Sequence, residues 1–310
     1  MPIISPHSDR PISLCIVVVL YQRAIRDSAT CLSLANQKFK DRGDLFLVYD
    51  NSPCSNLGSV PTGWEVVIDS SNGGLFAAYS YSISRAKSAG CSWILLLDQD
   101  TELPSDFLLT VHESLALSHD KKDVVAIVPI VKAGNRQVSP MLPGLGKESP
   151  FALRDVVETK WLMAINSGTC LRVEFIESIG GFSELFWLDY LDHWLFKMIH
   201  NQRKSVYVGS VVVQHDLSVA NMNKGLTVQR YKNVLRAERQ FTNSYLPILW
   251  RFALVPRLLA RAIKHFVITR DKRLGFLMLV GAAAQMVEMA RNYRLATTSS
   301  GTPAAKRHGE

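Results

Sequence analysis

Two aspartates separated by one residue, Asp98 and Asp100, directly follow the apolar run Trp93–Leu97. This run predicts a buried strand, and in an extended segment residues i and i+2 point the same way. Two carboxylates that face one way repel each other unless a cation lies between them, and Mg²⁺ or Mn²⁺ bridging to a diphosphate satisfies that arrangement. A polar turn, helped by Thr101 and Pro104, is the simpler alternative, but the buried strand before it favours a divalent metal site.

A second pair of acids, Asp189 and Asp192, lies three residues apart among eight large apolar residues. A helix is predicted over residues 188–201, and it would place both acids on one face. A solvated helix face is the alternative, but such apolar neighbours argue against it. A carboxylate that faces a cleft can take a proton from a hydroxyl nucleophile, so this segment is a candidate for the general base. His193 is adjacent but points elsewhere.

Polar residues also follow other predicted strands. Asp50 begins an Asp-Asn-Ser segment that, taken alone, is better explained as an Asx turn. Asn72 can cap a helix, and Gly73 and Gly74 permit close backbone approach by a ligand. His215 ends a β-branched strand and is a candidate to ligate a metal or contact phosphate, although a lone histidine is more often structural. Neither a GxGxxG fingerprint nor a Walker lysine is present at these positions.

These groups require elements that bring them together, and short β-branched runs alternate with helical patterns over the first 130 residues. Strands are predicted at residues 12–20, 45–49, 64–68, 93–97 and 124–131, and helices at residues 26–37, 74–89 and 104–117. A long loop at 132–160, structure at 161–173 and a strand at 205–213 complete the prediction. The alternation predicts an α/β fold with a mostly parallel sheet, which binds ligands beyond the carboxyl ends of its strands.

The formal net charge of +8 is distributed unevenly along the 310 residues. Residues 1–220 hold 19 basic and 23 acidic residues, whereas residues 221–310 hold 16 basic and 4 acidic ones. Arg257, Arg261 and Lys264 fall on one helical face, which predicts an amphipathic helix on an anionic membrane surface. Packing on the body of the chain or on another subunit is the alternative. Nucleic acid is not an expected partner, because the basic segment carries no helix-turn-helix, RNP or zinc signature.

Cysteine usage and hydropathy bear on the compartment. The five cysteines are odd in number and none has CxxC spacing, which predicts reduced thiols in the cytoplasm. The N-terminal segment does not fit a signal peptide. The nearest candidate for a membrane span, Leu274–Val287, has only 14 residues and contains Gln285, so no transmembrane helix is predicted.

Taken in order, these residues resemble the family 2 inverting glycosyltransferases with the Rossmann-like GT-A fold, and they are most similar to the bacterial rhamnosyltransferase-like branch. The resemblance spans residues 12–244. Its carrying segments are Ile16–Tyr21, Val48–Ser52, Asn72–Gly74 with Ala77 and Ala78, Leu95–Thr101, Asn166–Gly168, Gly180–Phe182, Phe186–Trp194 and His215. The Leu-Leu-Asp-Gln-Asp-Thr and Asp-Tyr-Leu-Asp-His-Trp runs are the most diagnostic.

The resemblance implies three groups of site residues. The nucleotide-sugar pocket would be lined by Tyr21, Asp50, Asn72, Gly73, Asp98, Asn166 and Ser167. A divalent metal, Mg²⁺ or Mn²⁺, would be held by Asp98, Asp100 and His215. The general base would be Asp192, with Asp189 as the alternative.

Two departures from the family pattern leave the donor sugar and the choice of base open. His193 stands where an acidic residue is usual before the last Trp, and aromatic residues stand at Tyr79–Tyr81 where a second asparagine is usual.

The implied activity is that of an inverting, metal-dependent hexosyltransferase. It would move a sugar, with rhamnose the leading candidate, from a dTDP- or UDP-linked donor to a hydroxyl of a lipid-linked oligosaccharide or of a growing cell-surface polysaccharide such as lipopolysaccharide O-antigen. A sugar nucleotidyltransferase and a non-catalytic nucleotide-sugar-binding protein are the alternatives.

The expected organisation is a GT-A domain over residues 1–244, a basic amphipathic helical extension over 245–300 and a disordered tail over 301–310. Within the first, residues 12–131 would be the nucleotide-binding half and residues 161–244 the acceptor and catalytic half. The expected location is cytoplasmic and peripheral on the inner face of the cytoplasmic membrane, with a homo-oligomer left open.

Overall fold

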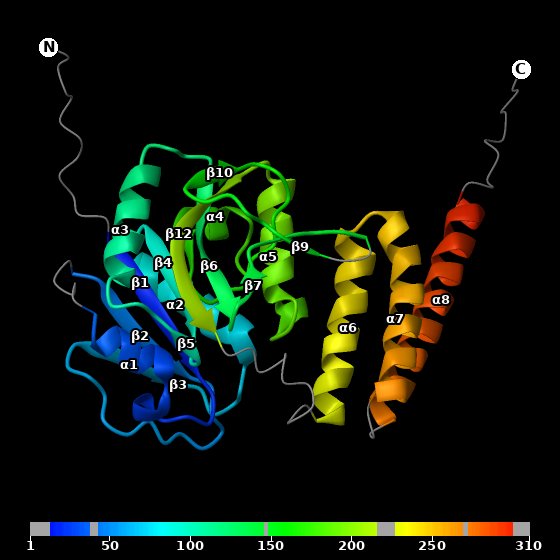
Figure 1. Cartoon of the computed structure of the whole chain (residues 1–310), viewed down its shortest axis with the longest axis horizontal. Helices are drawn as coiled ribbons and strands as arrows, with labels where there is room; N and C mark the ends of the chain where they lie inside the picture. The colour runs from blue at the N-terminus through cyan, green and yellow to red at the C-terminus, as the bar shows by residue number, and fades with distance from the viewer. Residues whose placement is uncertain (1–12, 38–42, 146–147, 216–226, 269–271, 300–310) are drawn as a thin grey trace, which may run out of the picture. The chain divides into compact units, whose positions relative to one another are not determined.

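The computed structural model describes residues 13–37, 43–145, 148–215, 227–268 and 272–299 (Figure 1). The chain forms two compact units, unit 1 over Met1–Asn221 and unit 2 over Met222–Glu310. This division lies earlier in the chain than the boundary expected at residue 244, because the helix that ends at Tyr245 belongs to unit 2. The tail expected at 301–310 lies outside the described residues.

Unit 1 is built on one large sheet whose strands run in the order β10-β12-β6-β11-β4-β1-β2-β3, where β10 is Val156–Glu158. In addition, β5 (Thr101–Glu102) pairs with β12, and β7 (Arg136–Ser139) pairs with β6. The bounds of its main strands are β1 (Leu14–Leu20), β2 (Leu45–Asp50), β3 (Trp64–Ile68), β4 (Trp93–Asp98), β6 (Val124–Ala133), β11 (Thr169–Arg172) and β12 (Ser205–His215). The pairs β1–β2, β1–β4, β2–β3 and β6–β12 are parallel, whereas β11 is antiparallel to both of its neighbours. The sheet is therefore mostly parallel, as the alternating pattern predicts.

The register of the parallel strands brings their carboxyl ends together. Leu20 of β1 is opposite Asp50 of β2, and Val19 is opposite Asp98 of β4. Asp50 is in turn opposite Ile68, the last residue of β3. The polar residues that follow three strands in sequence thus meet at one edge of the sheet.

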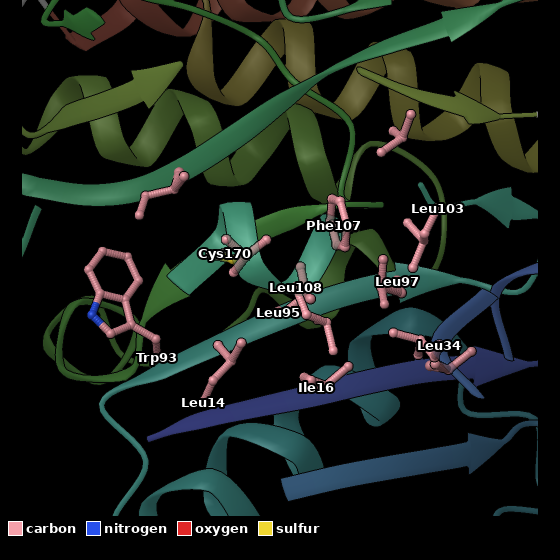
Figure 2. Packing of buried hydrophobic residues seen from close by; sticks show 14 of the residues in the cluster. Leu14, Ile16, Leu34, Trp93, Leu95, Leu97, Leu103, Phe107, Leu108 and Cys170 are labelled. Carbon is pink, nitrogen blue, oxygen red and sulfur yellow. The ribbon is translucent and has the colours of Figure 1, made fainter. Parts of the chain in front are cut away.

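Helices cover both faces of this sheet. Alternate residues of β1, such as Leu14 and Ile16, pack with residues of α1 (Ala29–Ala35) and α3 (Phe107–Ser118) in one hydrophobic cluster (Figure 2). Residues between them on β1 face the opposite side, where α2 (Gly74–Ser88) packs against β1, β2 and β4. Because β1 is buried along its whole length, its β-branched sequence suits a central strand.

Two predicted segments differ from the structure. The helix expected at 26–37 is divided into a 3-10 turn, Ile25–Asp27, and α1, because extended Ser28 caps α1 by accepting a hydrogen bond from the Cys31 amide. The loop expected at 132–160 contains four short strands in its described residues. Their bounds are β7 (Arg136–Ser139), β8 (Met141–Leu142), β9 (Ser149–Pro150) and β10 (Val156–Glu158). Their short pairings escape a periodicity signal, which needs longer runs.

The described part of unit 2 consists of three helices, α6 (Val228–Tyr245), α7 (Ile248–Ile268) and α8 (Arg273–Ser299). Leu254, Leu258, Met278 and Ala282 are central members of its hydrophobic core. A Cβ added at Gly281 of α8 would lie 3.6 Å from the Leu258 Cδ1 of α7, which is an ordinary van der Waals contact. The helical extension is thus a packed unit with its own core.

One described segment, Arg273–Arg291 in α8, is long and apolar enough to cross a membrane, whereas the sequence alone predicts none. One-third of its 18-residue window is buried in the structure. Length and composition alone are weak evidence, because core helices of water-soluble proteins meet the same criteria.

Candidate functional site

Asp98, Asp100 and His215 form a cluster at the carboxyl edge of the sheet, and their candidate ligand atoms all lie within 4.8 Å of one another. Asp98 ends β4, Asp100 follows it, and His215 ends β12. The His215 Nδ1 lies 3.6 Å from an Asp100 carboxylate oxygen. Two carboxylates and an imidazole are a donor set that suits Mg²⁺ or Mn²⁺, so the structure brings together the three residues predicted to hold a metal.

Thr101 links the two halves of this cluster. Residues Thr101 and Glu102 form β5, which pairs with β12 so that Thr101 is opposite His215. The fully buried Thr101 hydroxyl lies 2.8 Å from the His215 Nδ1 and 2.6 Å from the Ser167 hydroxyl. Ser167 also accepts a hydrogen bond from the Asp98 amide at 3.0 Å. A buried network of this kind orients the imidazole before any ligand arrives.

The peptide of the Asp98-Gln99-Asp100 segment is held from its other side by buried hydroxyls at the start of α1. The Ser28 hydroxyl donates to the Gln99 carbonyl at 2.8 Å, and Thr30 bonds to both the amide and the carbonyl of Thr101. The Gln99 side chain accepts from the Tyr21 amide at 2.9 Å. The start of α1 after Ser28 therefore matters for the site, because it places the Ser28 and Thr30 hydroxyls beside the Asp98-Gln99-Asp100 turn.

The electrostatics of Asp98 favour a bound cation. Burial, which is the largest cause, and the nearby carboxylates Asp100 and Asp192 together raise the pKa of its carboxyl to about 7. Ionisation of Asp98 is costly because the carboxyl is buried beside two other acids. A divalent cation that neutralises these acids would make its ionisation favourable. The charge and chemistry of these residues therefore fit a divalent metal.

Asp192 lies in the first turn of α5 (Leu191–Asn201) and is paired with the next residue. One Asp192 carboxylate oxygen accepts from the His193 amide at 2.7 Å and lies 2.8 Å from the His193 Nδ1. Burial alone would raise the pKa of Asp192, but its charge and hydrogen-bond interactions with His193 outweigh burial and lower that pKa below its usual range. The carboxylate is thus kept ionised, as a proton acceptor requires.

Asp189 and Asp192 do not share a helix face, which corrects the prediction of a helix from residue 188. Tyr190 has a left-handed backbone with φ of 67°, so α5 begins only at Leu191. Asp189 therefore lies outside the helix, before this bend. The i, i+3 relation that made the two acids equivalent does not exist, and Asp192 alone is held in the first turn of α5.

Several buried polar atoms at the same edge have no hydrogen-bond partner among the described residues. They are the second carboxylate oxygen of Asp50 and the side-chain oxygens of Asn51 and Asn166. The first Asp50 oxygen accepts from the Ser52 amide and hydroxyl, so the expected Asx turn is present. Because buried polar atoms are nearly always paired in native proteins, such a concentration at a sheet edge favours a ligand that supplies donors.

The Asn72-Gly73-Gly74 segment is shaped by protein contacts. A Cβ at Gly74 would overlap the Trp187 carbonyl oxygen, and one at Gly73 would lie 2.5 Å from the Ala77 Cβ. Both glycines thus admit neighbouring protein groups, whereas the sequence suggests that they admit a ligand. Asn72 has φ of 56° and forms no side-chain cap on α2.

Asp69, which sequence reasoning missed, fixes this loop. Its carboxylate accepts hydrogen bonds from the Ser71 hydroxyl, the Gly73 amide and the Tyr49 hydroxyl. These bonds lower its pKa, with Ser71 the largest cause and burial opposing it. The signal was available, since Asp69 directly follows the third predicted strand.

Tyr79 on α2 enters the sequence analysis only as a departure from the family pattern, and not as a site residue. Its side chain is fully buried, its hydroxyl has no partner among the described residues, and its ring packs against Phe182. Burial raises its pKa well above the usual value, and the charges of Asp98 and Asp192 add to the effect. An aromatic hydroxyl therefore lies within electrostatic reach of both acids. Nothing in a 15-residue helix pattern distinguishes it from a core tyrosine.

No protein-family model matches the chain, and no curated protein sequence does. Among solved structures, S. aureus TarS 1-349 in complex with UDP-GlcNAc matches at 13% identity and a TM-score of 0.48, with 92% of each chain covered. The mannosyltransferase PcManGT from Pyrobaculum calidifontis, in complex with GDP-Man and Mn²⁺, matches at 14% identity and a TM-score of 0.49, covering 94% of this chain and 81% of that one. Both TM-scores are below 0.5, so the function proposed below rests on the site itself.

Proposed function

We propose that the chain is a glycosyltransferase that moves a sugar from a nucleoside-diphosphate sugar to an acceptor hydroxyl, with inversion and with a divalent metal. The observation that carries the proposal is the Asp98, Asp100 and His215 cluster at the carboxyl edge of a parallel sheet, with Asp192 held ionised nearby. A single displacement needs both parts, an electrophilic site for the leaving diphosphate and a separate base for the incoming hydroxyl.

Each residue has a defined task in this scheme. Asp98, Asp100 and His215 would hold the metal, and Thr101 would orient His215. A metal bound there would supply positive charge against the leaving nucleoside diphosphate. Asp192 accepts the proton of the acceptor hydroxyl as its oxygen attacks the anomeric carbon, and the diphosphate leaves from the opposite face. The configuration at that carbon is therefore inverted.

The donor is proposed to be a dTDP- or UDP-linked sugar, with rhamnose the leading candidate. Asp50 presents a buried carboxylate oxygen that can accept from a base or ribose donor, and Asn166 presents a buried amide oxygen. Tyr21, Asn72 and the backbone at Gly73 are proposed to complete the pocket. The acceptor is proposed to be a hydroxyl of a cell-surface polysaccharide or of a lipid-linked oligosaccharide, reached from the cytoplasm.

The proposal is tested by thermal shift with a panel of nucleotide-sugars, with and without Mn²⁺, followed by donor turnover with the donor that stabilises the fold. A bound donor raises the melting temperature by an amount that grows with the logarithm of its concentration divided by its Kd. We expect stabilisation that requires Mn²⁺ and is lost in Asp100→Asn, together with Mn²⁺-dependent release of nucleoside diphosphate.

The matched control is Asp106→Asn, which removes an aspartate from the turn before α3, outside the cluster. It should behave as the wild-type chain does. Stabilisation by donors without any turnover would favour a non-catalytic binding protein, and release of pyrophosphate from a sugar phosphate and a nucleoside triphosphate would favour a nucleotidyltransferase. Either outcome would overturn the proposed transfer.

A further inference from the structure

Unit 2 carries more of the exposed large apolar side chains than its share of the residues predicts. It contains fewer than a third of the residues, yet 11 of the 23 exposed large apolar side chains in the described chain belong to it. All 11 lie on α7 and α8. Scattered apolar residues are normal at a surface, but a concentration on two helices marks an interaction surface.

Exposed apolar residues of α7 form a continuous stripe, here called the α7 stripe. They recur every three or four residues, which places them on one helix face. The members are Leu249, Phe252, Pro256, Leu259, Ile263 and Val267. The opposite face of α7, with Leu254 and Leu258, fills the core of the unit, so the helix is apolar on two sides.

The exposed residues of α8 form a second stripe, here called the α8 stripe, with the same spacing. Its members are Phe276, Leu279, Val280, Ala283, Met286, Val287 and Ala290. Val287 is 69% exposed, and Phe276 at the other end is 61% exposed while its ring packs edge-on against Phe266 of α7. A helix that needs only one apolar face to fold carries a second one here.

Cations accompany the stripes, and the acids are already neutralised. The α7 sequence contains no Asp or Glu, and Arg257 and Lys264 lie along one flank of its stripe. The two acids described in unit 2, Glu238 and Glu288, are paired with Arg261 and Arg239 at 2.8 and 3.1 Å. The predicted cationic face is thus corrected in one position, because Arg261 turns to the buried Glu238.

This charge distribution identifies the occupant. A second copy of the chain would bring its own cations against those of the first, with no described acid at the stripes to balance them. An anionic lipid surface instead offers acyl chains to the stripes and phosphates to Arg257 and Lys264. Spanning of the bilayer by α8 is disfavoured, because fully buried Gln285 bonds to Asn243 of α6 and ties α8 into the three-helix unit.

We infer that the α7 and α8 stripes of unit 2 dock the protein on the surface of an anionic phospholipid bilayer, as a peripheral contact. The apolar stripes enter the headgroup boundary, and the flanking cations contact lipid phosphates. The inference concerns unit 2 alone and does not depend on the proposed transfer reaction.

The test is vesicle flotation of the full chain with phosphatidylcholine vesicles, with and without roughly 30 mol% phosphatidylglycerol. We expect recovery with the anionic vesicles to exceed that with neutral vesicles by about tenfold or more. Binding should fall when the salt is raised from about 0.1 M to about 1 M, and alkaline carbonate should release the protein. Equal recovery with both vesicles, no recovery with either, or resistance to carbonate would each overturn the inference.

Paired variants test whether the α7 stripe itself binds the vesicles or whether any added negative charge weakens binding. Phe252→Glu with Ile263→Glu should lower partitioning about tenfold or more. The matched control, Leu117→Glu with Leu153→Glu, introduces the same two charges at equally exposed leucines of unit 1 and should lower it much less. Equal losses in both would overturn the role of the stripe.

A second pair of variants keeps the test valid if the first disturbs folding. Arg257→Glu with Lys264→Glu should lower binding to anionic vesicles about tenfold or more and leave helicity unchanged by circular dichroism, whereas Lys122→Glu with Lys160→Glu in unit 1 should have a much smaller effect. A stripe-dependent dimer in sedimentation velocity, with no vesicle binding, would show that a second copy covers the stripes and would overturn the lipid assignment.

Discussion

The two units depart from the usual distribution of polar and apolar groups in opposite ways. Unit 1 buries polar atoms without partners at the carboxyl edge of its sheet, in Asp50, Asn51 and Asn166. Unit 2 pairs its buried Gln285 with Asn243 and its buried Glu238 with Arg261, and leaves apolar side chains exposed on α7 and α8. Buried polar atoms without a partner among the described residues also occur away from the sheet edge, in Asp44, Ser118 and His200 of unit 1 and in Arg239 of unit 2.

The difference is informative because both departures cost stability. A buried polar atom without a partner costs about 1–3 kcal/mol, and exposed apolar surface forgoes about 25 cal/mol per Å². A ligand with hydrogen-bond donors would remove the first cost, and an apolar surface would remove the second. The comparison thus supports the proposals of a polar small-molecule ligand for unit 1 and of a lipid surface for unit 2. The following predictions test how separate these two proposed roles are.

The largest effect is expected at Asp192, the proposed base. Asp192→Asn retains the shape of the side chain but cannot accept a proton, so turnover should fall by about 10²–10⁴ while donor binding is retained. The measurements are steady-state transfer and donor thermal shift. Vesicle binding through unit 2 should not change.

The matched control is Asp189→Asn, which removes the other candidate acid outside α5. It should retain most of the activity, because the left-handed bend at Tyr190 separates it from the first turn of the helix. A larger loss in Asp189→Asn than in Asp192→Asn would reverse the assignment of the base.

The second effect concerns the stability of unit 1 at the contact between Gly74 and Trp187. Gly74→Ala forces a left-handed backbone on alanine and overlaps the Trp187 carbonyl, so it should lower the free energy of unfolding by about 2–5 kcal/mol. Gly90→Ala shares the φ of +72° but meets no atom within 4 Å, and should cost only about 1–2 kcal/mol. Denaturant unfolding measures both, and equal losses would contradict a role for the Trp187 contact.

Much of the fold and of the candidate metal site follows from local patterns. The β-branched runs predict the strands, and because parallel strands end at a common edge, Asp50, Asp98 and Asp100 are expected to meet. Their neighbours are less accessible to sequence reasoning. Thr101 gains its role by pairing with His215 across 114 residues, and no local spacing encodes such a contact.

The errors share a physical cause, which is a contact or a bend that overrides local periodicity. A helix pattern starting at residue 188 is interrupted by one residue, Tyr190, whose left-handed backbone its sequence does not reveal. In unit 2 the cations of α7 form one face in isolation, but Glu238 of α6 draws Arg261 inward. The periodicity of a helix predicts its faces, and only its neighbours decide which face is buried.

A smaller effect on the free energy of unfolding should distinguish the buried salt bridge of unit 2 from the more exposed one. Glu238 is almost fully buried against Arg261, so Glu238→Gln should lower the free energy of unfolding by about 1–2 kcal/mol. Glu288→Gln breaks the more exposed pair with Arg239 and should cost about 0–1 kcal/mol. Equal costs in denaturant unfolding would mean that the polar interior of unit 2 does not stabilise it, which would weaken the contrast with unit 1.

The smallest effect is a shift in pH dependence within unit 1. His193 lowers the pKa of Asp192 against the effect of burial, with Asp98 and Tyr79 as the other titratable groups nearby. Because Asp192 must be ionised to accept a proton, activity is present above its folded pKa and is lost as the pH falls through that value.

Removing the imidazole in His193→Gln takes away the largest influence that lowers this pKa. The acid limb of the rate profile should therefore move to higher pH, with the plateau rate at high pH much less affected. Rate profiles of the wild type, His193→Gln and the more distant His119→Gln measure the shift, and the His119 variant should retain the wild-type limb. An unchanged limb in His193→Gln would mean that Asp192 does not set the acid limb, and a limb moved to lower pH would mean that His193 raises the pKa of the group that does.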